Sequence, residues 1–139
     1  MRHVDIGRVS SVYPDRATVR VLFEDKGGDE VVSRELPIVG RGSVRVKDYW
    51  LPKVDEMVVC IFVEGSAKQG YVLGSIFNDV DKVPVNEETK RHIEFEDGAF
   101  VQYDIKNKNM TINLVGNGTL DIKGRIIADQ FITRNGGAS

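Results

Sequence analysis

The residues best suited to nucleophilic chemistry are a single cysteine, Cys60, and two histidines, His3 and His92. A cysteine acts as a nucleophile only as a thiolate, which requires a nearby base or cation at an accessible position. Cys60 instead lies inside the apolar run MVVCIFV at residues 57–63, which predicts a buried thiol packed as a small hydrophobic side chain. A lone cysteine also excludes an intrachain disulfide, so nothing points to an oxidising compartment.

Acidic side chains gather at two places, Glu94 with Glu96 and Asp97, and Asp79 with Asp81. Glycoside hydrolysis needs two carboxylates facing each other across a cleft, and adjacency in sequence does not supply that geometry. The pair Asp79 and Asp81 lacks the further ligands and the glycine of an EF-hand calcium loop. We therefore expect solvated acids beside turns, no enzymatic activity, no metal site and no cofactor.

A short basic run, Arg41, Arg45 and Lys47, introduces a binding function as the alternative. Small β-barrels often bind single-stranded nucleic acid through a basic groove and stacked aromatic rings. The chain has 19 basic and 21 acidic residues and a net charge of −2, whereas affinity for phosphates comes largely from excess positive charge. A solvated loop, or one facing an acidic partner, explains the run more simply. The rings available for stacking are Tyr13, Phe23, Tyr49, Trp50, Phe62, Tyr71 and Phe77.

Short strand patterns position these residues, and helical periodicity is hard to find. Val, Ile, Phe and Tyr recur in brief alternating runs that Gly, Asp, Asn and Pro interrupt. Such a series favours an all-β protein with a small closed barrel over residues 1–84, because closure removes exposed strand edges. An OB fold is the first choice and an SH3-like barrel the second. The strands are expected at residues 4–12, 17–23, 30–38, 57–63 and 70–77, with hairpin loops at 25–29 and 64–70.

Residues 78–88 are polar and interrupted by a proline, and a linker at residues 85–91 is expected to precede a second domain at residues 92–139. Its apolar/polar alternations recur about every ten residues, which is typical of β-solenoids and stacked strands. A segment this small needs disulfides, metals or oligomerisation to be stable, and oligomerisation is what remains. Two-fold pairing, packing onto the barrel, or one larger β domain would also bury its apolar residues. The predicted interface residues are Ile105, Ile112, Leu114, Leu120, Ile122, Ile126 and Phe131.

Several blocks of the chain resemble the N-terminal OB domain of phage baseplate assembly protein V, which gpV-like tail spikes and the VgrG proteins of type VI secretion share. The blocks are IGRV at residues 6–9, YPD at 13–15, YWLP at 49–52, DEMVV at 55–59 and GYVLGSIFND at 70–79. Residues 124–133, GRIIADQFIT, look like the last turn of that family's trimeric β-helix. The motif residues expected to belong to the OB core are Trp50, Pro52, Gly74, Phe77 and Asn78.

The resemblance implies a homotrimeric structural spike with an OB collar under a baseplate hub protein and a short intertwined β-helix. Such a spike belongs to the virion of a contractile tail, or to a related injection machine, and meets the host membrane when it punctures the envelope. The chain departs from the family at its end, where residues 132–139 lack the His-x-His motif that holds an iron ion at the apex. We therefore expect no metal at the tip, and either a separate tip protein below it or a machine that needs little piercing. The first residues show no signal-peptide core, which predicts synthesis in the host cytoplasm. Nucleic acid is not expected as a partner, because the chain has no excess of positive charge.

Overall fold

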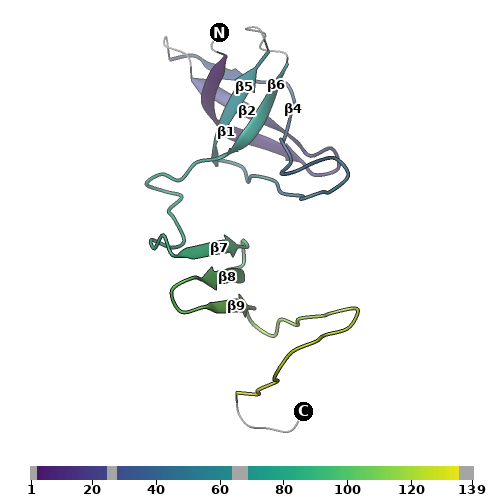
Figure 1. Ribbon diagram of the computed structural model, residues 1–139. Coiled ribbons are helices and arrows are strands. Elements are labelled where there is room, and N and C mark those ends of the chain that lie inside the picture. The colour runs from purple at the N-terminus through teal and green to yellow at the C-terminus, as the bar shows by residue number, and fades with distance from the viewer. Residues whose placement is uncertain (1–2, 25–27, 64–68, 135–139) are drawn as a thin grey trace. The chain divides into compact units, whose positions relative to one another are not determined.

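All regular structure in the computed structural model, which describes residues 3–24, 28–63 and 69–134, is β-strand (Figure 1). In this described part there is no helix, and hence none that could cross a membrane. The chain divides into two units, Met1–Val83 and Pro84–Ser139. The strands are β1 (Val4–Tyr13), β2 (Thr18–Glu24), β3 (Glu30–Val32), β4 (Leu36–Pro37), β5 (Met57–Phe62), β6 (Gly70–Ser75), β7 (Lys90–Glu94), β8 (Phe100–Asp104) and β9 (Asn109–Asn113).

The hydrophobic core of the first unit comes from strands whose side chains alternate between interior and solvent. In β2, Val19, Val21 and Phe23 point inward, while the residues between them are half-buried or exposed. In β5 the inward residues are Val58, Cys60 and Phe62. The rings of Phe23 and Phe62 meet edge to face with centroids 5.6 Å apart. The remaining members of the core are Val9, Leu36 and Val72.

The sheet of the first unit is six-stranded and has the neighbour order β3-β2-β1-β5-β6, with β4 paired to β2. A closed barrel requires the strands at the two edges of the sheet, here β3 and β6, to pair with each other, and the expectation of closure was wrong for the described residues. The outer edge of β6 is paired at one position only, the parallel bridge between Ile38 and Val72. The reason is local. The strand β4 ends at Pro37, and residues 39–56 form no strand that could pair further with the edge of β6.

Cys60 is fully buried in this core, as the apolar run around it predicts. Burial raises the pKa of its thiol to about 12, with a smaller contribution from the nearby negative charge of Asp5. We expect the native protein to resist a thiol-specific chromogenic reagent at pH 8 and to react with it fully in denaturant. An Arg34→Cys variant, placed at an exposed position, supplies the control because it should react at once without unfolding. Rapid labelling of native wild-type protein would contradict the burial.

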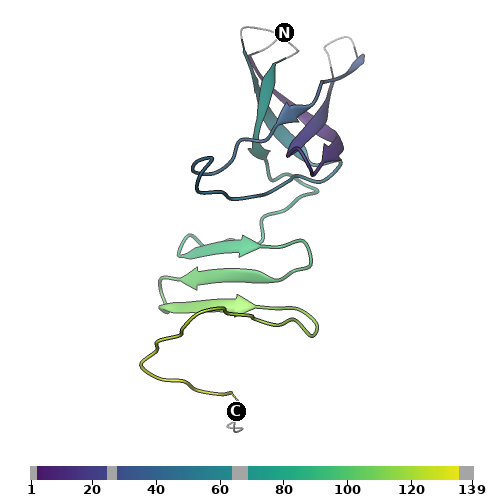
Figure 2. The same ribbon diagram turned by 90° about the vertical axis from the view of Figure 1, so that its right-hand side faces the viewer.

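The second unit is an antiparallel meander of β7, β8 and β9, without a hydrophobic core of its own (Figure 2). Ala99 is the one buried apolar side chain among its described residues. The first strand begins at Lys90, inside the segment that was expected to be a linker. Residues 115–134 contain no strand, although their apolar alternation predicts short ones. A strand is defined by its pairing with a neighbouring strand, and no described strand of this chain pairs with that segment. The predicted turns at 25–27 and 64–68 and the end at 135–139 lie outside the described residues.

Candidate assembly surfaces

The β7-β8-β9 sheet has one apolar face, created by the register of its strands. Ile93 pairs with Val101, and Val101 pairs with Ile112, so these three side chains form one row across the sheet. Tyr103 pairs with Met110 in the next row on the same side. Cross-strand neighbours of this kind contact one another and are the unit of sheet stabilisation. We call Ile93, Val101, Tyr103, Met110 and Ile112 the apolar face.

The apolar face is uncovered in the single chain. Met110 is 64% exposed, Ile112 49% and Ile93 47%. A three-stranded sheet gains independent stability only when its hydrophobic face packs against something. Contiguous apolar patches on a soluble protein mark contact surfaces. The second unit therefore presents a candidate contact surface.

The opposite face of the same sheet is polar and its side chains bond to one another. His92 lies between Gln102 and Glu94, with Nδ1 3.0 Å from Gln102 Oε1 and Nε2 3.0 Å from Glu94 Oε1. The imidazole also stacks on Phe100 with ring centroids 4.8 Å apart. The polar side chains of this face are hydrogen-bonded to one another, so the face can remain in contact with solvent. The contrast between the two faces indicates which one is covered in an assembly.

Two turns hold the register that produces the apolar face. Between β8 and β9, Asp104 accepts hydrogen bonds from the backbone of Lys106 at 3.0 Å and of Asn107 at 3.3 Å, and from Asn107 Nδ2 at 2.9 Å. Burial opposes ionisation of Asp104, but these bonds outweigh it and lower the pKa of the carboxyl group. Between β7 and β8, Asp97 Oδ1 accepts the Ala99 N–H at 2.9 Å, and Gly98 has a φ of 93°. A slip of one residue would reverse the two faces.

The predicted interface residues are all exposed in the single chain. Ile112 belongs to the apolar face, while Ile105 and Leu114 directly follow β8 and β9. The other four, Leu120, Ile122, Ile126 and Phe131, lie in the strandless segment and are 55%, 51%, 56% and 75% exposed. Sequence reasoning missed Ile93, Val101, Tyr103 and Met110 as interface residues. Their alternation along the chain was the available signal, but only the pairing register aligns them.

The OB motif residues lie in different environments within the first unit. Pro52 is fully buried, and Trp50 is half-buried with its Nε1 enclosed. Asn78 organises the turn after β6, because its Oδ1 accepts the N–H groups of Val80 at 2.8 Å and Asp81 at 2.9 Å. Gly74 is half-buried. Phe77 is 66% exposed and lies outside the core of the single chain, which differs from its expected place there.

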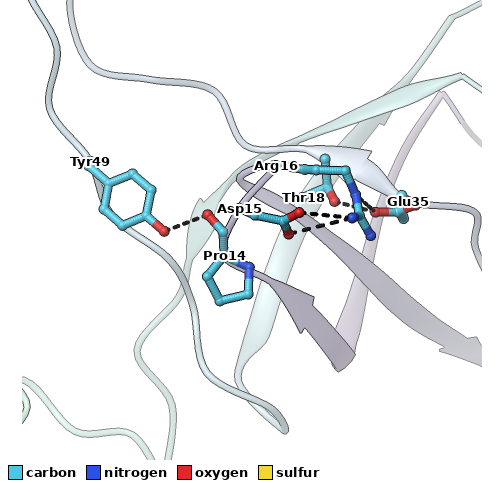
Figure 3. A network of polar contacts seen from close by, with 6 residues as sticks. All are labelled: Pro14, Asp15, Arg16, Thr18, Glu35 and Tyr49. Carbon is cyan, nitrogen blue, oxygen red and sulfur yellow. Dashed lines mark hydrogen bonds and ion pairs between the residues drawn. The ribbon is translucent and has the colours of Figure 1, made fainter.

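A polar network ties the β1–β2 turn to two distant segments (Figure 3). Glu35 Oε1 accepts hydrogen bonds from Thr18 Oγ1 at 2.7 Å and Arg16 Nε at 2.8 Å. The bond from Thr18, and after it the bond from Arg16, lowers the pKa of Glu35 and keeps its carboxyl group ionised. Arg16 also pairs with Asp15 at 3.1 Å. Tyr49 Oη donates to the Pro14 carbonyl at 2.8 Å, which anchors the end of the 39–49 loop.

The candidate catalytic groups have structural roles where the structure describes them. Glu94 pairs with His92, and Asp97 closes the β7–β8 turn. The described residues contain no group of three or more His, Cys, Asp or Glu side chains able to hold a metal ion. Among the described residues, the feature most open to a functional contact is therefore the exposed apolar face of the second unit.

A six-stranded sheet of OB type, followed by a small amphipathic sheet, defines an all-β protein with an OB-type domain. Residues 6–77 match the model of the type VI secretion system/phage-baseplate injector OB domain, and the chain belongs to this family, which confirms the resemblance of its motifs. The chain is also 26% identical over 84 residues to the spike protein of Escherichia phage P2. That similarity covers 60% of this chain but only 40% of the phage P2 protein.

Proposed function

We propose that this protein is the central spike of a contractile tail baseplate, assembled as a homotrimer. The observation that carries the proposal is the uncovered apolar face of β7–β9, in a chain whose OB domain belongs to a baseplate injector family. In the proposed trimer each copy covers the apolar face of its neighbours. The strandless residues 115–134 then wind with their counterparts into a short β-helix, in which strands of different chains pair.

The energetics favour such a trimer. Full burial of one Val, Ile or Met side chain contributes roughly 1.5–3 kcal/mol. Each copy carries five residues of the apolar face and the seven predicted interface residues, of which Ile112 is common to both sets. Packing of this size far exceeds the stability of an isolated meander. The similarity to the phage P2 spike protein supports a spike over a two-fold or barrel-packed arrangement.

The proposed role is mechanical. The three OB domains form a collar below the baseplate hub protein, and the shaft is driven into the target envelope when the sheath contracts. Strand pairing between chains leaves few free backbone groups and makes the shaft stiff. The spike is a virion component made in the host cytoplasm, it acts without catalysis, and a separate tip protein caps its end.

The first test is the absolute mass of the full-length protein by light scattering. The expected value is three times the 15.5 kDa of one chain. A protein truncated after Val83 keeps the complete OB core and is expected to lose the shaft-driven assembly. A full-length monomer at micromolar concentration would contradict the spike.

The alternative, single-stranded nucleic-acid binding, is not favoured. Two of the rings it would use, Phe23 and Phe62, are in the core and pack against each other. Stacking of bases requires accessible ring faces. A fluorescence titration with labelled oligonucleotides is expected to show no saturable binding.

A further inference from the structure

The OB sheet is open between the segment that follows β4 and the end of β6, and this opening forms a groove. Past the bridge between Ile38 and Val72, the segment that follows β4 and the end of β6 separate without further pairing in the described residues. The space between them has a volume of about 550 Å³. We call this the seam groove, and we define it by the lining residues Val39, Trp50, Glu56, Leu73, Phe77 and Asp81.

The seam groove has apolar walls and more acidic than basic side chains. Leu73 is 47% exposed and Phe77 66%. Glu56 and Asp81 outnumber the single cation of the groove, Arg41. The groove therefore suits a basic, partly apolar segment.

The same chain presents a segment of that chemistry. Val44, Arg45, Val46 and Lys47, here called the basic knob, alternate apolar and basic residues, and Val44 and Val46 are 84% and 76% exposed. The knob is held in shape by Ser43, whose Oγ accepts the Val46 N–H at 3.0 Å. Ser43 N–H in turn donates to the Val46 carbonyl at 3.4 Å. A preformed loop loses little conformational entropy on docking.

We propose that the basic knob of one copy docks into the seam groove of the next copy around the three-fold axis of the collar. Val44 and Val46 then cover Leu73 and Phe77. Arg45 and Lys47 face the carboxylates of Glu56 and Asp81. A contact between two different patches closes into a ring when the rotation fits, and three copies close this one. This inference rests on the proposed trimer and adds a second contact to it, in the OB collar.

The test is a disulfide trap in the full-length protein. A Val46→Cys/Leu73→Cys double variant, oxidised in dilute solution, is expected to give a covalent trimer on a non-reducing denaturing gel. Each single variant is expected to stay uncrosslinked, because the native Cys60 is buried and each contact needs both positions. Light scattering on the same samples separates the two proposals: a trimer without crosslinks overturns the docking alone, and a monomer overturns both.

A second readout does not depend on forming a disulfide. Trp50 is the only tryptophan, so its emission reports on the seam groove. Val46→Asp is expected to shift this emission to longer wavelength, while the mass stays trimeric because the shaft is unchanged. Arg34→Glu, an exposed charge change outside the knob and the groove, is the matched control and should leave the emission unchanged. A trimer with unchanged Trp50 emission in Val46→Asp, and no crosslink in the double variant, overturns the proposal.

Discussion

An Ile112→Asp variant is expected to convert the full-length protein from a trimer to a monomer at micromolar concentration. Ile112 ends the row that begins with Ile93 and Val101 on the apolar face. In the proposed trimer the substitution buries one unpaired carboxylate per copy. The penalty for each is several kcal/mol, and every 1.4 kcal/mol changes an equilibrium constant about tenfold. Light scattering measures the mass, and circular dichroism confirms that the OB unit remains folded.

The matched control is Asn113→Asp, which places the same charge on the next residue of β9. Asn113 is exposed and lies on the polar face, in the row of Glu94 and Phe100. Because this face is expected to meet solvent, the variant should remain trimeric. Equal masses for the two variants would mean that the register does not determine the interface, and the proposed assembly would then fail.

A Leu36→Ala variant is expected to lower the free energy of unfolding of the OB unit by about 2–5 kcal/mol, the range for a buried leucine reduced to alanine. Leu36 is completely buried, and it lies in the two-residue strand β4, which is paired to β2 through Val19. The cavity would open beside the one bridge that spans the seam. Denaturant unfolding followed by Trp50 fluorescence measures the loss.

Val31→Ala provides the comparison for this loss. Val31 also pairs with β2, opposite Phe23, but it is 47% exposed on the edge strand β3. Surface substitutions away from special features usually change stability by less than about 0.5 kcal/mol. Comparable losses for the two variants would show that Leu36 does not carry the core as its burial indicates.

Several features of the fold were predictable because they depend on neighbouring residues. The alternation of Val19, Val21 and Phe23 marked β2 and its inward face. The apolar run around Cys60 predicted a buried thiol. The motif blocks from residue 6 to residue 79 pointed to the baseplate OB family, which the match over residues 6–77 establishes.

Other features could not be predicted, because distant contacts decide them. The closed barrel was expected because closure removes exposed strand edges. Closure depends, however, on whether the segment after Pro37 pairs with the edge of β6, and it does so only at Ile38. Phe77 belongs to a motif of the OB family, but its side chain lines the seam groove and is 66% exposed. The end of the expected linker overlaps β7, which begins at Lys90, because this polar residue pairs with Asp104.

By itself the sequence determined that the chain is built from short strands, that its second half is too small to form a stable core alone, and that its motifs are those of a baseplate OB domain. These properties follow from residue alternation, composition and order along the chain. Only the tertiary structure decided which apolar side chains share one face, and that the OB sheet stays open beside Trp50. The physical reason is that strand register and sheet closure are set by hydrogen bonds between residues far apart in sequence, which no local pattern encodes.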